Sequence, residues 1–162
     1  MYLGYVMRMT QPNRRMFWHL SRAHRRVSAA ADENLADIGL TGTQAGALFC
    51  FTDDGLLVGE LAAALDLAQS AASGLAQRLE DAGLIARHEV EGDGRAARLK
   101  LTAVGRRKRD EAVRRTVAAN ARLLQGFSDK DIEIVVRWLS HAADTAAPKP
   151  VAAKRMRRKE KA

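Results

Sequence analysis

The chain has 162 residues, of which 47% are apolar and only 5% aromatic, a composition typical of one soluble globular domain with its own core. No stretch reaches the roughly 18 uninterrupted apolar residues of a membrane span, and Met1–Met7 is too short for the apolar core of a signal peptide. We therefore expect a cytoplasmic protein with no membrane partner. The single cysteine, Cys50, excludes an intramolecular disulfide and a thiolate metal cluster.

The net charge of +8 is distributed unevenly along the chain. Residues 1–31 carry six arginines and no acid, whereas residues 32–105 carry five basic and twelve acidic side chains. Residues 106–148 have a small basic excess, and residues 149–162 carry seven basic side chains and one acid. An argument for binding nucleic acid must therefore depend on where individual charges point, not on their sum.

The first predicted helix runs from about Arg14 to Ala36, because apolar residues recur there at helical spacing, and Gly39 ends it. Thr41-Gly-Thr-Gln44 has the pattern of a capping box, which opens a short apolar helix reaching about Phe51. Cys50 lies in this apolar run. We interpret it as an inert, buried thiol, the alternative being a redox sensor, which would need exposure and a lowered pKa.

A turn at Asp53-Asp-Gly55 precedes a third helix, predicted from about Val58 to Leu65. A fourth helix is predicted from about Gln69 to Ala82, with Gly83 as its stop. Two short alternating runs follow, Ala86–Val90 and Ala97–Thr102. They are joined by the glycine-rich turn 91–95, so together they predict a β-hairpin.

Thr102 can cap a fifth helix that runs to about Gln125, and Ser128-Asp-Lys-Asp131 predicts the start of a sixth. The sixth helix should bury one apolar face, formed by Ile132, Val135, Val136 and Leu139. From Thr145 onward the chain turns to Ala, Pro, Lys and Arg without periodicity, which predicts a disordered basic tail.

The order of these elements predicts a mainly α protein with a small β-hairpin wing, in which a winged helix-turn-helix is joined to a helical dimerisation region. The expected organisation is an N-terminal extension (1–13), a single domain (14–144) and a tail (145–162). Within that domain the winged helix-turn-helix covers about 41–102, with its helix, turn, helix and hairpin from about Leu57 to Thr102. The dimerisation helices cover about 14–37 and 103–144.

The predicted fourth helix separates into two faces on a helical wheel. Its apolar side is formed by Ala68, Ala72, Leu75, Ala76 and Leu79. The opposite side is polar and carries no acid near its start, which suits a helix whose first turns enter the major groove of DNA. The candidate DNA-binding residues on this helix are Gln69, Ser70, Ser73, Gln77 and Arg78.

The hairpin supplies the second group of candidates. Asp93 and Arg95 lie at its predicted tip, where a guanidinium can enter the minor groove. Arg87, Arg98 and Lys100 could meet phosphates. A solvated amphipathic helix and a solvated hairpin tip are each common, but helix, turn, helix and basic hairpin within about 45 residues are a much more specific combination.

Over about residues 14–143 the chain resembles the MarR family of bacterial transcriptional regulators. The resemblance is carried by Leu40-Thr-Gly-Thr-Gln44 with Leu48, Glu60-Leu-Ala62, Arg78-Leu-Glu-Asp-Ala-Gly-Leu-Ile85, and Asp93-Gly-Arg95 leading to Leu101-Thr102. It implies a homodimer built by the first, fifth and sixth helices, with Arg95 as the minor-groove arginine and Asp93 as its wing partner. One position departs from the family pattern, because Ala68 stands where many relatives have a capping Ser or Thr.

The function predicted from the residues and this resemblance together is sequence-specific binding of a pseudo-palindromic site in double-stranded DNA. The resemblance implies a repressor released by a small, often aromatic effector. Trp18, His24 and Trp138 are possible pocket or interface residues, but we expect each of them to be ordinary packing or surface. Two other classes stay open, a non-specific architectural DNA binder driven by the basic tail and a protein-interaction adaptor. We expect no catalytic site, cofactor or metal site, because the four histidines are scattered and no catalytic motif occurs.

Overall fold

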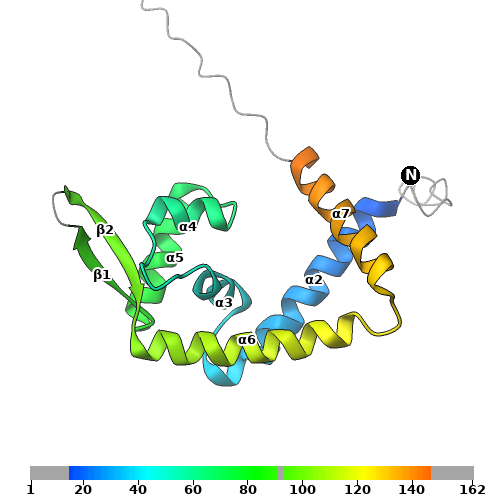
Figure 1. Ribbon diagram of the computed structural model, residues 1–162, viewed down its shortest axis with the longest axis horizontal. Coiled ribbons are helices and arrows are strands. Elements are labelled where there is room, and N and C mark those ends of the chain that lie inside the picture. Colours follow the sequence, from blue (N-terminus) through cyan, green and yellow to red (C-terminus); the bar gives the residue numbers. More distant parts are fainter. Residues whose placement is uncertain (1–14, 91–92, 147–162) are drawn as a thin grey trace, which may run out of the picture. The chain divides into compact units, whose positions relative to one another are not determined.

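The computed structural model describes residues 15–90 and 93–146, and within this part the side chains of residues 89–96 are left undescribed. The described chain is mostly helical, with one two-stranded antiparallel hairpin (Figure 1). Its elements in order are α2 (Met16–Leu35), the 3-10 turn η2 (Ala36–Ile38), α3 (Gly42–Phe49), α4 (Val58–Ala64), α5 (Gln69–Asp81), β1 (Ile85–Val90), β2 (Asp93–Leu101), α6 (Ala103–Leu123) and α7 (Asp129–Ala146). The predicted fold class is confirmed.

The chain divides into two compact units at residues 119 and 120, inside α6. The first unit contains α2 to β2 and most of α6, and the second contains the end of α6 and α7. The predicted single domain over residues 14–144 stays a prediction.

The connection from α2 to α3 follows the capping signals in the sequence. Gly39 has a φ of 68°, a left-handed conformation that glycine adopts without strain, and it ends the η2 turn after α2. The Thr41 hydroxyl accepts a hydrogen bond from the Gln44 backbone N–H at 3.2 Å, and Gln44 Oε1 accepts one from Thr41 N–H at 3.0 Å. The predicted capping box is therefore confirmed, and α3 ends at Phe49, slightly before the predicted boundary.

One apolar core joins α3, α4, α5 and the hairpin. The largest side chains that it buries completely are all leucines: Leu48, Leu61, Leu75, Leu79, Leu84 and Leu99. Leu99 also pairs through its backbone with Leu56, so the segment before α4 adds a single bridge to the edge of β2. This core fixes α5 and the hairpin relative to each other.

The hairpin pairs residues Ile85–Glu89 with Ala97–Leu101 in regular antiparallel register, from Ile85 opposite Leu101 to Glu89 opposite Ala97. The register then shifts, and Val90 pairs with Asp93. The expected loop over residues 91–95 is therefore too long, because β2 already begins at Asp93. Sequence patterning missed these strand residues because glycine-rich segments predict turns.

The start of α6 lies directly against the turn between α5 and β1. Thr102 caps α6, accepting a hydrogen bond from Gly105 N–H at 3.0 Å, and its own hydroxyl donates to the Gly83 carbonyl oxygen at 2.7 Å. A Cβ added at Gly105 would lie 1.9 Å from the Leu84 carbonyl oxygen. Only glycine therefore fits at this contact, which joins α6 to both the hairpin and α5.

Arg115 ties the middle of α6 to the end of α2. Its guanidinium donates to the backbone oxygen of Asn34 at 2.8 Å, forms a bidentate pair with the carboxylate of Asp37, and donates to Glu111 Oε1 at 2.8 Å. This pairing lowers the pKa of Asp37 and of Glu111, because Arg115 favours the ionised form of each carboxyl.

In the second unit, α7 begins with a further capping box. Asp131 Oδ2 accepts from Ser128 N–H at 3.0 Å, and Asp131 N–H donates to the Ser128 hydroxyl at 3.3 Å. Hydrogen bonding to Ser128 lowers the pKa of Asp131. The helix continues to Ala146, so the prediction that the tail begins at residue 145 is wrong by two residues, and residues 147–162 lie outside the described chain.

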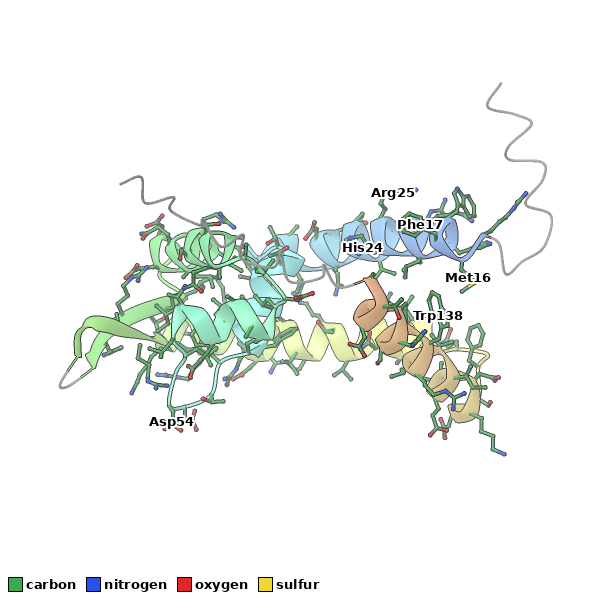
Figure 2. All side chains as sticks on the ribbon, turned by 90° about the horizontal axis from the view of Figure 1, so that it is seen from above. Met16, Phe17, His24, Arg25, Asp54 and Trp138 are labelled. Atoms are coloured by element: carbon green, nitrogen blue, oxygen red, sulfur yellow. The ribbon has the colours of Figure 1, made fainter. Side chains whose placement is uncertain are left out.

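The apolar faces predicted on the long helices are largely exposed in the single chain. On α7 the predicted buried face is wrong, since Ile132 is half-buried and Val135, Val136 and Leu139 are exposed. Phe17 on α2 is 84% exposed, and Val117 on α6 is 63% exposed. Figure 2 shows Phe17 extending from α2 and Trp138 from α7. The wheel patterns identify these stripes correctly, but one chain does not supply the surface that would cover them.

None of the helices in the described chain has the length and apolar character needed to cross a membrane.

We predict that Gly105→Ala lowers the free energy of unfolding by about 3 kcal/mol, because its methyl group overlaps a backbone oxygen that cannot move independently. Gly46→Ala in α3 is the matched control, since nothing lies within 4 Å of a Cβ added there. That substitution should stabilise the protein by about 0.5–1 kcal/mol by restricting the unfolded chain. Urea unfolding measures both values, and equal effects would contradict the close contact at Gly105.

We also predict that Arg115 makes stability depend on acidic pH. Folding lowers the pKa of Asp37 and Glu111 from their ordinary values of 3.8 and 4.5. The stabilisation is therefore complete above these values and is lost as the pH falls below them. Arg115→Gln should be less stable than wild type at pH 7, and the difference should shrink toward pH 3. Urea unfolding at both pH values measures it, and a constant difference would contradict the assignment.

Candidate nucleic-acid interface

The buried face of α5 anchors the helix in the core. Ala72, Leu75, Ala76 and Leu79 are all buried, as the wheel predicts. Ala68, which the wheel places on the same side, is exposed, because it lies before the first turn of the helix and outside the core contact. The apolar stripe therefore begins one turn later than predicted.

The opposite face of α5 presents the predicted polar residues to solvent. All five candidates are exposed: Gln69, Ser70, Ser73, Gln77 and Arg78. The Ser73 hydroxyl donates to the Gln69 backbone oxygen at 2.9 Å and keeps its lone pairs free to accept hydrogen bonds. The Gln77 amide nitrogen donates to Asp81 Oδ1 at 2.9 Å, which leaves its carbonyl oxygen available.

The N-terminal end of α5 has no side-chain cap. Ala68 occupies the capping position in extended conformation and forms no side-chain hydrogen bond, in agreement with the departure seen in the sequence. The first turn also carries no acid. Its backbone N–H groups are therefore open to an anion from outside, and the helix dipole favours one there.

Gly74 leaves part of the exposed face of α5 without a side chain. The nearest atom to a Cβ added at this position is Arg78 Nη1, at 3.6 Å, so the glycine is not required by packing. Its absence of a side chain lets another surface approach the helix backbone closely.

The residues predicted to contact phosphates lie on both faces of the hairpin. Arg87 is directly opposite Leu99, so it shares the face turned toward α5, where its Nε donates to Glu80 Oε2 at 2.8 Å. Arg98 and Lys100 lie on the other face with their cross-strand partners His88 and Ala86. The three residues therefore do not form one cluster.

Arg98 has structural partners of its own. Its Nη1 donates to the Gly55 backbone oxygen at 3.2 Å and lies 3.8 Å from Glu60 Oε2. Gly55 has a φ of 77°, and a Cβ there would approach the Leu99 carbonyl oxygen to 2.4 Å. The turn 53–55 is thus held against β2, and part of the hydrogen-bonding capacity of Arg98 is used within the protein.

The backbones of Asp93 and Arg95 belong to β2, but their side chains lie outside the described part of the chain. The roles expected for them in the wing remain predictions.

Sequence reasoning missed the acidic partners that hold the basic residues in place. Glu80 pairs with Arg87 across the turn after α5, and Glu60 reaches Arg98 from α4. Neither spacing is a helical i, i+4 pattern, so no local signal in the sequence indicates these pairs. The sequence contains a basic run, Arg106–Arg109, but it does not indicate that this run lies beside the hairpin.

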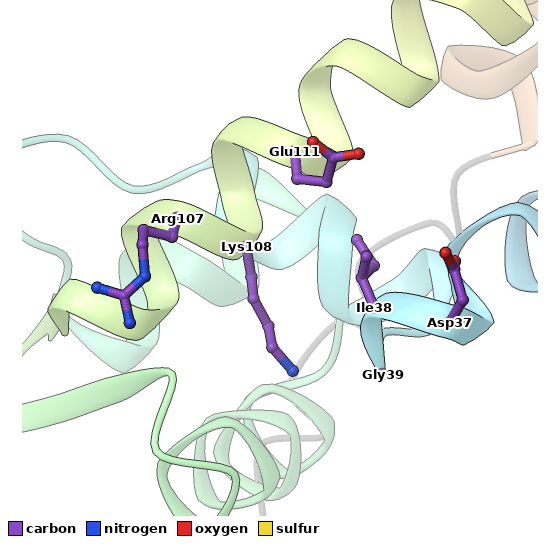
Figure 3. A pocket seen from close by; sticks show the side chains of 6 residues that line it. All are labelled: Asp37, Ile38, Gly39, Arg107, Lys108 and Glu111. Atoms are coloured by element: carbon purple, nitrogen blue, oxygen red, sulfur yellow. The ribbon is translucent and has the colours of Figure 1, made fainter.

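An open cavity of about 500 Å³ lies between η2 and α6 (Figure 3). Lys108 extends from α6 toward Gly39, and its Nζ would lie 3.3 Å from a Cβ at that glycine. Asp37 and Glu111 also line this cavity, and the two carboxylates already share Arg115. Trp18, His24 and Trp138, which we expect from the sequence to be ordinary packing or surface, do not line this cavity.

Cys50 is half-buried, and its thiol donates to the Gly46 carbonyl oxygen at 3.3 Å. Burial raises the pKa of this thiol, which favours the inert interpretation over a redox sensor. Among the described residues, no group of three or more His, Cys, Asp or Glu side chains could hold a metal ion.

A model of the MarR family matches residues 38–96. A MarR-family transcriptional regulator from Rhodococcus sp. RHA1 is 27% identical, with a TM-score of 0.68 over 86% of this chain and 98% of that one. CouR from Rhodococcus jostii RHA1, in a structure with p-coumaroyl-CoA, is 29% identical, with a TM-score of 0.69 over 83% of this chain and 93% of that one.

The fold is also similar to that of MepR from S. aureus in its complex with DNA. The identity is 21%, with a TM-score of 0.73 over 80% of this chain and 96% of that one. No curated protein sequence matches the chain.

Proposed function

We propose that this chain is a winged-helix transcriptional regulator of the MarR family, and that it binds a pseudo-palindromic operator in double-stranded DNA as a homodimer. The observation that carries the proposal is α5, a helix with a buried apolar face and an exposed face that is polar and free of acid in its first turn. In each subunit this helix enters the major groove, and the hairpin follows the DNA toward the adjacent minor groove.

The exposed residues of α5 divide by chemistry into base readers and phosphate contacts. The amides of Gln69 and Gln77 can form paired hydrogen bonds with adenine. The Ser70 hydroxyl can donate or accept at a base edge in the major groove, and the Ser73 hydroxyl, which donates to Gln69, can accept there. Arg78 meets a phosphate, and the uncapped N–H groups of α5 meet another. Gly74 allows the approach that these contacts require.

On the hairpin we propose Arg95 as the minor-groove residue and Asp93 as its partner, following the family resemblance. Arg87 lies on the face toward α5, where it pairs with Glu80. When DNA binds, a phosphate can replace the Glu80 carboxylate as the partner of its guanidinium, so the charge of Arg87 stays paired. Arg98 and Lys100 are weaker candidates, because they lie on the other face and Arg98 is bonded to Gly55.

The dimer is supported by apolar surface that the single chain leaves open on α2, α6 and α7. Each helix carries exposed aliphatic or aromatic side chains at helical spacing, including Phe17, Val117 and Val135. Exposed apolar faces of this kind are typical of an interface. A two-fold dimer would place two α5 helices in successive major grooves, about 34 Å apart.

We further propose that the regulator is a repressor released by a small aromatic effector. CouR was crystallised with p-coumaroyl-CoA, a thioester with an aromatic acyl group, and is among the more similar sequences here. Release requires only that the effector bind more tightly to a form whose α5 helices do not match the groove spacing. Because the proposed ligand is chromosomal DNA, we place the protein in the cytoplasm.

The test of this function is selection of bound sequences from a random DNA pool, followed by footprinting. We expect a pseudo-palindrome, and Arg95→Ala should weaken its binding and reduce the slope of log affinity against log salt by about one. Arg137→Ala on α7 is the control for lost charge and should leave the slope unchanged. Anisotropy titrations at several salt concentrations measure both.

Two outcomes would count against the proposal. If deletion of residues 149–162 abolishes all binding and no protected sequence is left, the protein is an architectural binder that depends on its tail. If Arg95→Ala changes no activity, the winged helix is an interaction module without a DNA role.

For the dimer we predict that Val135→Asp yields a monomer, because a carboxylate would be buried without a partner in the interface. His141→Asp adds the same charge on the opposite side of α7 and should stay dimeric. Light scattering gives the mass of each variant. A wild-type chain that is a stable monomer at micromolar concentration would refute the dimer.

A further inference from the structure

A second cavity, of about 300 Å³, lies at the base of the hairpin and is distinct from the exposed face of α5. The hairpin, the turn at Thr52 and Asp53, and the first turns of α6 enclose it. Its lining is mainly basic, formed by His88, Lys100, Arg106 and Arg109.

The cavity keeps a basic excess after its neighbouring acids are counted. Among the described residues, Asp53 is the only acid that lines the cavity and Asp110 pairs with Arg109 beside it, so Lys100, Arg106 and Arg109 keep a basic excess of one. Arg106 Nη1 donates to the Leu101 backbone oxygen at 2.9 Å, and Arg109 Nε donates to Asp110 Oδ1 at 3.1 Å. No hydrogen bond or ion pair to another described residue engages Lys100. The cavity therefore offers free donors and a positive potential.

The walls of the cavity are held in place. The turn at Asp53 is pressed against β2 by Gly55, where a Cβ would lie 2.8 Å from Lys100 Cγ. The buried side chain of Leu101 gives the cavity an apolar wall, and the bond from Arg106 fixes one guanidinium against the strand end. The site thus exists before a ligand binds, which lowers the ordering cost of binding.

We propose that this cavity binds a small molecule bearing a carboxylate or a phosphate. Arg109 and Lys100 would hold the anionic group, and the Leu101 side would accept an apolar body. The volume is at the lower end of the range of small-molecule sites, about 300–1,000 Å³, so the ligand has few heavy atoms.

A free small molecule fits this position better than a DNA phosphate does. Lys100 pairs with Ala86, near the base of the hairpin, and Val90, where β1 ends, lies four residues farther along the strand. At about 3.3 Å per residue, this pair lies about 13 Å from the end of β1. Lys100 also lies on the hairpin face opposite Arg87, which is the residue turned toward α5.

Binding here would link the wing to α6, because Lys100 and His88 belong to the hairpin and Arg106 and Arg109 to the helix. The effect of the ligand on DNA affinity rests on the function proposed above, but binding of the ligand does not. The two are therefore measured separately.

The experiment follows thermal unfolding of the full chain with added benzoate or inorganic phosphate, against sodium chloride at matched ionic strength. Arg109→Gln removes one ligand-binding guanidinium, and Arg107→Gln removes the same charge from a neighbouring residue that does not line this cavity. At least one probe should raise the melting temperature of wild type and of Arg107→Gln equally. Arg109→Gln should need about tenfold more of it. Arg109→Lys, which keeps the charge, should be intermediate.

Failure of both probes to stabilise wild type beyond the chloride control would overturn the proposal, as would equal responses of the two glutamine variants. A second measurement, made without probe, compares their DNA affinities at several salt concentrations. Equal slopes support a small-molecule site. A slope lower by about one in Arg109→Gln alone would show that the cavity holds a DNA phosphate and would refute the small-molecule assignment.

Discussion

The close contact between Gly105 and the Leu84 carbonyl oxygen is the constraint on which the rest of this structure depends. Leu84 lies between α5 and β1, and Gly105 lies in the first turn of α6, so a single point of contact fixes three elements. Thr102 strengthens it, because its hydroxyl both caps α6 and donates to the turn at Gly83. The helix that presents polar residues, the hairpin beside it and the long helix leading toward the second unit are thereby joined at one place.

This junction couples α6 to the hairpin and to α5. Only Thr102 separates β2 from α6, and its hydroxyl is bonded to the turn after α5, so these three elements are closely connected. Arg115 adds a second fixed point, where α6 holds the end of α2 through Asn34 and Asp37. The basic cavity beside Arg109 and Lys100 lies close to the first of these points. A ligand there would have little effect on a freely hinged wing, but it can bias one that moves as a unit with α6.

The sequence predicts the elements that local chemistry determines. Capping boxes at Thr41 and Ser128 and the glycine stops at Gly39 and Gly83 act over a few residues, so their signals are readable and most helix bounds are close. The buried face of α5 follows from periodicity in the same way. What sequence reasoning could not provide are pairings across the fold, such as Glu80 with Arg87 and the Gly105 contact. The apolar stripe on α7 was predicted to be buried, but it is exposed in the single chain. Periodicity identifies an apolar face of a helix, but it does not show which surface covers that face.

The acidic character of residues 32–105 does not conflict with DNA binding once the individual acids are placed. Asp32 accepts from the Gly42 N–H at 2.6 Å, Glu60 accepts from the Leu57 N–H at 2.7 Å, and Glu80 pairs with Arg87. These carboxylates cap helices or neutralise cations, and none lies in the first turn of α5. The same pairing occupies Arg87 and Arg98, so few cations of the head are free for phosphates. It follows that α5 should contribute mainly base selectivity, whereas the salt-dependent part of the affinity should come largely from Arg95 and from basic residues outside the head.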